Sequence, residues 1–209
     1  MTDLAWLLFA AAGIFAAGDW IAVVTRNKGL EYVCKPAAVL LLLQVAVALE
    51  PRNDAQRWAF VVALAFSLAG DVLLMIDRFV PGLIAFFLAH IAYIVGLRFG
   101  QDEYLPLLLS ALVVFAAMAI VGRRILTAVR ERFPELTTPV SGYIAVISVM
   151  VACALASGNA LAATGAVLFM ASDTLIAWNR FVRELSWAPI TIIVTYHLAQ
   201  AGLVLSLTL

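Results

Sequence analysis

The chain has 209 residues, of which 65% are hydrophobic, and its mean hydropathy is +1.06. Only 12% of the residues are charged. Soluble domains carry roughly twice that share, so a water-facing shell around a core of this size is excluded. The formal net charge is zero, which argues against nucleic acid as a partner. The composition therefore indicates a polytopic membrane protein.

A membrane-spanning helix needs about 20 apolar residues, and the chain has eight segments of about that kind, the second of them short. We expect an all-α fold, with residues 1–209 forming a single eight-helix transmembrane domain. The first segment follows Met-Thr-Asp without a positively charged leader, so we interpret it as a membrane helix and not as a signal peptide. The expected helices cover residues 4–24, 36–50, 57–76, 80–99, 104–122, 139–156, 160–179 and 187–207.

The distribution of Lys and Arg over the expected loops predicts the orientation. Three of these residues fall on the side of the N-terminus and ten on the other side, which we therefore expect to be cytoplasmic. Both termini should then lie outside the cell, and the expected location is a bacterial inner membrane. The longest loop, residues 123–139, reads either as a short amphipathic helix on the interface or as a solvated loop.

A repeat runs through the chain. The segments GDWIAVVTR (18–26), GDVLLMIDR (70–78) and SDTLIAWNR (172–180) each carry Asp with Arg seven residues later. The aspartates recur at multiples of about 51 residues, which is the length of one helical hairpin, and a proline is expected near the start of each second helix of a hairpin. A unit of two helices keeps its orientation in the membrane, so the spacing predicts parallel helical-hairpin repeats.

Carboxylates inside membrane helices indicate a function or a partner, because burying one costs a few kcal/mol on insertion scales. Asp71 and Asp173 are therefore the leading functional candidates. The structural alternative is a hydrogen bond or an ion pair with Lys35. Asp19 lies nearer the expected interface, where we expect it to pair with Arg26 or Lys28.

The repeat places the other polar residues in the same cytoplasmic half of the bundle, as a pocket open to the inner leaflet. His90 shares a helical face with Tyr93 and is either a hydrogen-bonded structural histidine or a catalytic one. Tyr143, Tyr196 and Gln200 are either pocket residues or contacts between helices. Lys35 could bind a lipid phosphate or simply extend its amine to the interface.

Motifs for other chemistry are missing from the sequence. There is no HExxH or CxxC spacing for a metal, no G-x-S-x-G turn and no phosphate-binding loop. We therefore expect neither a metal nor another cofactor.

Six segments in this order resemble the YhhN-like family of lysoplasmalogenases, over nearly the whole chain. The most specific of them are GDVLLM and the later SDTLIA. The segments are KPAAVLLLL (35–43), SLAGDVLLM (67–75), GLIAFFLAHIAYI (82–94), SGYIAVISVM (141–150), GAVLFMASDTLIA (165–177) and TYHLAQAGLVL (195–205).

The resemblance implies an eight-helix enzyme without a cofactor that hydrolyses the vinyl-ether bond of lysoplasmalogens. The products would be a fatty aldehyde and glycerophosphoethanolamine or glycerophosphocholine, and the partner would be a vinyl-ether lysolipid in the membrane. The resemblance also implies a set of site residues. By position these are Asp71 and Asp173 as catalytic residues, with Lys35, His90, Tyr93, Tyr143, Tyr196 and Gln200 as substrate-binding residues.

Vinyl-ether hydrolysis fits a pair of aspartates. The β-carbon must first be protonated, which creates an oxocarbenium ion that water then attacks. One carboxylic acid supplies the proton and one carboxylate stabilises the cation, and neighbouring carboxyl groups in an apolar pocket readily divide these roles.

Two alternatives use the same residues. An intramembrane aspartyl protease also has two membrane aspartates, but its G-x-G-D motif is missing at both positions here. A proton-coupled transporter would also bury carboxylates, but it would show broken helices at mid-membrane. The head group, the identity of the acid and the oligomeric state stay open at this point.

Overall fold

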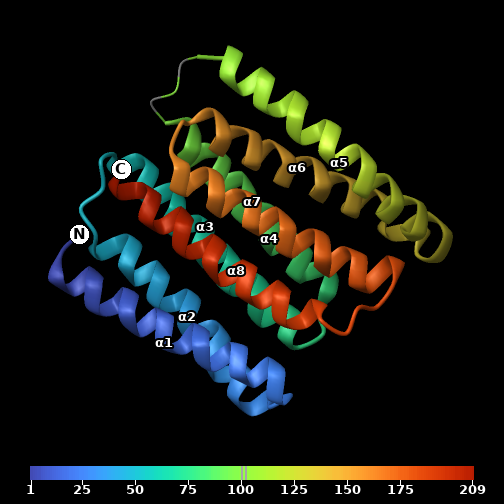
Figure 1. Cartoon of the computed structure of the whole chain (residues 1–209), viewed down its shortest axis with the longest axis horizontal. Helices are drawn as coiled ribbons and strands as arrows, with labels where there is room; N and C mark the ends of the chain where they lie inside the picture. Colours follow the sequence, from blue (N-terminus) through green and yellow to red (C-terminus); the bar gives the residue numbers. More distant parts are fainter. Residues whose placement is uncertain (100, 102) are drawn as a thin grey trace.

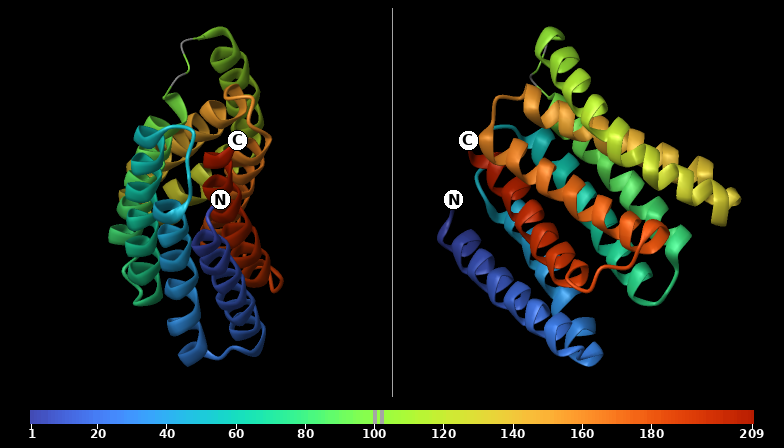
Figure 2. Two further views of the ribbon diagram at one scale, coloured as in Figure 1. Left: turned by 90° about the vertical axis from the view of Figure 1, so that its left-hand side faces the viewer. Right: turned by 45° about the vertical axis from the view of Figure 1, so that its right-hand side comes forward.

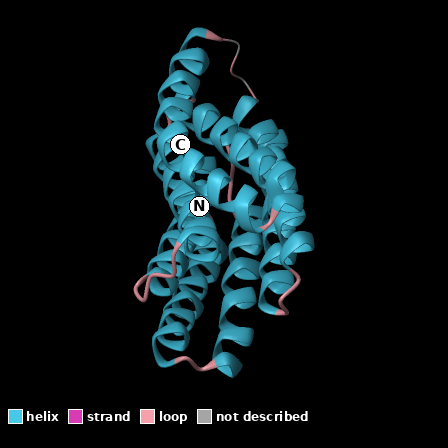
Figure 3. Cartoon of the chain, turned by 90° about the vertical axis from the view of Figure 1, so that its right-hand side faces the viewer, coloured by secondary structure: helices cyan, strands magenta, loops and turns pink. Residues whose placement is uncertain are grey.

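A computed structural model describes residues 1–99, 101 and 103–209. All regular structure in this part of the chain is helical (Figure 3). Eight of its helices are long and apolar enough to cross a membrane, so the protein is a multi-pass integral membrane protein. The helices are α1 (Asp3–Thr25), α2 (Lys28–Ala48), α3 (Asp54–Met75), α4 (Phe79–Arg98), α5 (Leu105–Arg132), α6 (Thr137–Ala156), α7 (Ala160–Ala177) and α8 (Ala188–Leu205).

Consecutive helices form hairpins, because short connections force neighbours to run in opposite directions. The most extensive packing is within the pairs α1 with α2, α3 with α4, α5 with α6 and α7 with α8 (Figure 1). α5 lies at one edge of the bundle, where it packs mainly against α6. Four successive hairpins agree with the expected repeat unit, and their superposition stays a prediction.

Both termini lie at the same end of the bundle (Figures 1 and 2). The Thr2 hydroxyl donates to the carbonyl of Ala48, near the end of α2, at 2.9 Å. Arg52, in the loop that follows, donates its backbone N–H to the carbonyl of Leu207 at 3.1 Å. This end therefore carries the α2–α3 loop together with both chain ends.

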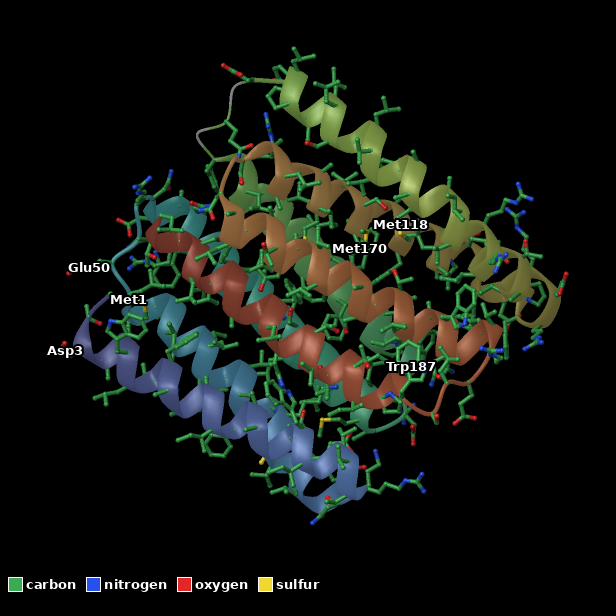
Figure 4. All side chains as sticks on the ribbon, in the orientation of Figure 1. Met1, Asp3, Glu50, Met118, Met170 and Trp187 are labelled. Carbon is green, nitrogen blue, oxygen red and sulfur yellow. The ribbon has the colours of Figure 1, made fainter. Side chains whose placement is uncertain are left out.

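The outer surface of the bundle is apolar, as lipid contact requires. Leu108, Leu112 and Ile120 on α5 are exposed. In Figure 4 the nitrogen atoms gather toward the ends of the helices, while the stretches between them carry mainly carbon. Trp187, labelled there at the start of α8, is 52% exposed, as is typical of an aromatic residue at the membrane interface.

The hairpin of α7 and α8 depends on one glycine. A Cβ atom at Gly165 would lie 2.8 Å from the carbonyl oxygen of Ala199 and 2.9 Å from the backbone nitrogen of Leu203. Only a residue without a side chain allows the two backbones to come this close, as small residues commonly do between membrane helices. The contact fixes α7, which carries Asp173, against α8, which carries Tyr196.

The expected start of the second helix was wrong. α2 begins at Lys28, not at residue 36, and Pro36 lies inside the helix. Asn27 caps the helix by accepting from the N–H of Leu30, and Lys28 forms an ion pair with Glu31 one turn later. These polar residues resemble a loop in sequence but stabilise a helix start. The other three prolines do lie in first turns, at Pro81, Pro139 and Pro189.

The expectation for residues 123–139 was also wrong in both of its forms. α5 continues without a break to Arg132, and α6 begins at Thr137 after a single 3₁₀ turn. Ile125 and Val129 are buried, and they form a small core with Val140 and Phe181. This burial stabilises the extra turns of α5, so the segment begins as a continuation of α5 that packs on the bundle.

Candidate active site

Asp71 on α3 lies at the centre of one polar network. Its side chain is buried, and its Oδ1 atom lies 3.1 Å from the amine of Lys35 on α2. Its Oδ2 atom accepts a hydrogen bond from the Tyr196 hydroxyl on α8 at 2.6 Å. The carboxylate is therefore held by a cation and a hydroxyl from two neighbouring helices. The ion pair that the sequence left as an alternative is present.

The network continues away from Asp71 through two further residues. Gln200 donates from Nε2 to the hydroxyl of Tyr196 at 3.3 Å. The hydroxyl of Tyr93 on α4 donates to Gln200 Oε1 at 2.5 Å. Tyr93 and Gln200 are fully buried. This chain of hydrogen bonds ties α3, α4 and α8 together, and it orients the tyrosine that holds Asp71.

Asp173 on α7 belongs to a second network. The hydroxyl of Tyr143 on α6 donates to Asp173 Oδ2 at 2.5 Å. The Nε2 atom of His90 on α4 lies 2.9 Å from the same hydroxyl and 3.3 Å from the same carboxylate oxygen. His90 is fully buried, and 10% of the Asp173 side chain is exposed. A carboxyl group, an imidazole and a phenol thus meet at one point.

The ring of Phe169 connects the two networks. Its centroid lies 4.8 Å from that of His90 and 5.5 Å from that of Tyr196, both in edge-to-face geometry. It also lies 6.4 Å from the ring of Tyr93. The structure therefore brings all eight residues expected at the site together in two networks around one buried aromatic ring.

An apolar cleft leads to Asp173. Its walls come from α3, α4, α5, α6, α7 and the π-helical turn Trp178–Val182 that follows α7. The polar residues that line it are Tyr143, Asp173 and Thr174. An apolar channel with a carboxyl group in its wall is suited to a molecule with a long hydrocarbon chain.

Asp71 does not line this cleft. Phe86 lines it instead, and its ring packs on Gly70, the residue next to Asp71. A Cβ atom at Gly70 would lie 2.6 Å from this ring. Phe86 also contacts the rings of Phe169 and Tyr196. Phe86 therefore separates the cleft from Asp71.

The expectation for Asp19 was wrong. Asp19 is fully buried, and it pairs with neither Arg26 nor Lys28. Its carboxylate lies 3.9 Å from His197 Nε2, and neither of its oxygens has a hydrogen-bond partner among the described residues. His197 in turn accepts from the indole N–H of Trp20 at 3.1 Å. The helix carries Asp19 on the face that packs into the bundle, which its distance from the helix end did not reveal.

The two aspartate networks offer few ligands for a metal cation. Among the residues that the structure describes, no three His, Cys, Asp or Glu side chains converge as a metal site. The candidate site is thus a set of acid, base and hydroxyl groups beside an apolar cleft.

The eight apolar helices enclose buried carboxyl groups and an apolar cleft. The protein therefore belongs to the class of polytopic membrane proteins that carry acid–base groups inside the helix bundle. The sequence model of the YhhN family matches residues 30–207 of the chain, so the protein belongs to the YhhN family.

Curated relatives agree with this assignment. The chain is 34% identical to "Lysoplasmalogenase TMEM86B" of Homo sapiens over 69% of its own length, and the match spans 61% of the human protein. It is 32% identical to the Rattus norvegicus protein of the same name, over 90% of this chain and 73% of the relative. It is 35% identical to "Lysoplasmalogenase" of Mycobacterium bovis, over 85% of this chain and 73% of the relative. No solved structure matches the chain.

Proposed function

We propose that the protein is an alkenyl ether hydrolase of the lysoplasmalogenase type. The observation that carries the proposal is the position of the Asp173 carboxyl group. It lines the cleft and is held by Tyr143 and His90. The names of the relatives supply the substrate class. The substrate would be a vinyl-ether lysolipid that enters the cleft from the membrane.

The reaction adds one water across the alkenyl ether. A proton joins the β-carbon of the double bond, and the resulting oxocarbenium ion takes up water at the carbon that carries the ether oxygen. The added water loses a proton, which leaves a hemiacetal. The hemiacetal then breaks its bond to the glycerol oxygen, giving a fatty aldehyde and glycerophosphoethanolamine or glycerophosphocholine.

Asp173 is the general acid in this proposal because it is the carboxyl group that lines the cleft. When Asp173 gives up its proton, Tyr143 and His90 stabilise the new carboxylate as hydrogen-bond donors. The carboxylate then takes the proton from the attacking water, which restores the acid. Positioned acid–base groups of this kind contribute roughly 10² to 10⁴-fold to a rate.

Asp71 takes the second role, that of the carboxylate that stabilises the cation and directs water. Lys35 pairs with it, and Tyr196 orients it. Phe86 must turn aside for this role, since its ring stands between Asp71 and the cleft. Gln200 and Tyr93 hold Tyr196 in place through a chain of hydrogen bonds.

We further propose that residues 1–209 act as one domain, with both termini outside a bacterial inner membrane and the site in the cytoplasmic half. The Lys and Arg residues support this orientation, since most of them belong to the end of the bundle opposite the termini.

The test uses the purified protein in detergent and two lysolipids that differ in one double bond. A synthetic 1-alkenyl lysolipid should release fatty aldehyde, and the 1-alkyl lysolipid of equal chain length should release none, since it has no carbon to protonate. Adding peptides to the same incubation tests the protease alternative. Cleaved peptide without aldehyde would replace this proposal with the protease, and the absence of both products would favour transport.

A further inference from the structure

The cleft has a defined direction, from the end of the bundle opposite the chain termini inward. Phe79 and Val140 line it in the first turns of α4 and α6, and Phe181 lines it just beyond the end of α7. These three residues mark the mouth. Met118 and Ile147 line it farther inside, roughly 15 to 20 Å from the ends of their helices at 1.5 Å per residue. Asp173 lies between the mouth and the inner end.

Arg180 lies at the mouth. Its guanidinium carbon is 3.9 Å from the centroid of the Phe79 ring and 5.8 Å from that of Phe181. Arg180 is exposed, and no carboxylate of the described residues lies within 4.0 Å of it. The two rings that it contacts both line the cleft. An arginine stacked on aromatic rings keeps its N–H groups free for an anion.

The third copy of the repeat differs from the other two at this arginine. α1 ends at Thr25 and α3 at Met75, so their arginines follow the helix. After α7, in contrast, the π-helical turn Trp178–Val182 continues the helix through Arg180. At roughly 1.5 Å per residue, the Cα atom of Arg180 lies about 10 Å along the helix from that of Asp173, in the direction of the mouth. π-helical turns are often found at functional sites.

This separation matches a lysolipid. Five single bonds lie between the vinyl-ether oxygen and the phosphorus atom, a span of roughly 6 Å. The lengths of the Arg180 and Asp173 side chains account for the difference between this span and the separation along the helix. With the phosphate at Arg180, the alkenyl bond would lie beside Asp173 and the chain would extend toward Met118 and Ile147. Arg180, Asp173 and the apolar inner residues then follow one another along the cleft in the same order as the phosphate, the alkenyl bond and the hydrocarbon chain of the lipid.

We propose that Arg180, stacked on Phe79, binds the phosphate of the lysolipid head group and thereby sets the depth of the alkenyl bond. The proposal rests on the proposed function for its choice of lipid. It assigns the phosphate to Arg180 and not to Lys35, because the Lys35 amine is engaged by Asp71 inside the bundle and does not line the cleft.

The experiment measures binding of a lipid that cannot be hydrolysed, so its result does not depend on the activity. Native mass spectrometry of the purified protein would compare the 1-alkyl lysolipid with 1-alkyl glycerol, which lacks the phosphate. Arg180→Gln should weaken binding of the lysolipid roughly 10-fold or more, the effect of losing a charge-assisted contact. It should leave alkyl glycerol binding unchanged, and Arg180→Lys should restore part of the loss.

Arg183→Gln is the matched control, since Arg183 is exposed just beyond the π-helical turn and its side chain makes no hydrogen bond or ion pair among the described residues. It should bind both lipids as the unmodified protein does. Equal lysolipid binding by Arg180→Gln and the unmodified protein would overturn the phosphate site. A similar loss of a diacyl phospholipid would show an anchor for bilayer lipid in general, which also overturns the proposal. In contrast, a missing aldehyde product with this binding pattern intact would overturn only the proposed function.

Discussion

The two aspartates on α3 and α7 have different partners, and the proposed mechanism gives them different roles on this basis. Asp71 is paired with a lysine and a tyrosine and is closed off from the cleft by Phe86. Asp173 is held by a tyrosine and a histidine and lines the cleft. Carboxyl groups in different surroundings can take different roles, here proton transfer for Asp173 and stabilisation of the cation for Asp71 in the proposed mechanism.

Lys35 should be required for stability because of its position beside Asp71. Lys35→Met would leave a buried carboxylate without its cation, which typically costs 3–5 kcal/mol. The thermal midpoint in detergent should therefore fall. The double variant Lys35→Met with Asp71→Asn should recover most of the loss, because the neutral amide needs no cation. Equal midpoints for the Lys35→Met variant and the unmodified protein would contradict the pairing.

Tyr143 should contribute to the chemical step through its hydroxyl, which donates to Asp173. Tyr143→Phe removes this donor and little else, so kcat for aldehyde release should fall by about 10-fold, the value of one charge-assisted hydrogen bond. KM should change little. Tyr32→Phe is the control, since the exposed Tyr32 hydroxyl donates only to the carbonyl of Met75. A change in KM alone would assign Tyr143 to binding.

The sequence was sufficient to find the polar members of the site, because a polar group in a membrane helix stands out against its apolar surroundings. It did not single out Phe86 or Phe169, and it gave Arg180 only a place in the repeat, with no role at the site. Phenylalanine in an apolar run looks the same whether it faces lipid or fills a site. Arg180 could not be distinguished from Arg26 and Arg78, since only the fold shows that the helix continues through it.

At the level of elements, the sequence located all eight helices but misplaced two boundaries. A polar first turn in α2 resembled a loop, and so did the arginine-rich last turns of α5. A membrane helix can continue beyond the apolar core of the bilayer where packing supports it. In α5 the buried side chains of Ile125 and Val129 provide this packing. Hydropathy reports the apolar stretch, and packing decides where the helix ends.

The hairpin of α7 and α8 offers a test at this scale. Gly165→Ala should separate the two helices, because the new methyl group would meet backbone atoms that cannot move aside. Overpacking of this kind costs typically 1–3 kcal/mol, or a fall of roughly 5 °C in Tm. Gly13→Ala is the control, since nothing lies within 4 Å of a Cβ there, and it should keep or raise Tm. Equal midpoints for both variants would contradict the close approach.

At the scale of the whole molecule, the fold places the α2–α3 loop and the segment after α7 at opposite ends of the bundle. Single cysteines at the exposed residues Glu50 and Glu184 would report the orientation, since Cys34 and Cys153 are buried. An impermeant maleimide should label Glu50→Cys in intact bacterial cells and Glu184→Cys only after the membrane is opened. Labelling of Glu184→Cys alone in intact cells would reverse the orientation.

The central claim is that Asp71 and Asp173 carry out the chemistry of one site, while the third aspartate of the repeat is structural. Asp19 is the natural control, since it is buried in the matching slot but lies with His197 and makes no hydrogen bond to either network among the described residues. An Asp→Asn change keeps the size of the side chain and removes the acid.

The direct measurement is the rate of aldehyde release from a synthetic 1-alkenyl lysolipid by the three Asp→Asn variants, each checked for an intact thermal transition. Asp71→Asn and Asp173→Asn should each lose at least ~10²-fold in kcat, the lower end of what a positioned acid or base contributes. Asp19→Asn should stay within about 3-fold of the unmodified protein and be no less stable, since it replaces a buried carboxyl group that has no hydrogen-bond partner among the described residues. Folded Asp173→Asn protein that releases aldehyde at the unmodified rate would contradict the account.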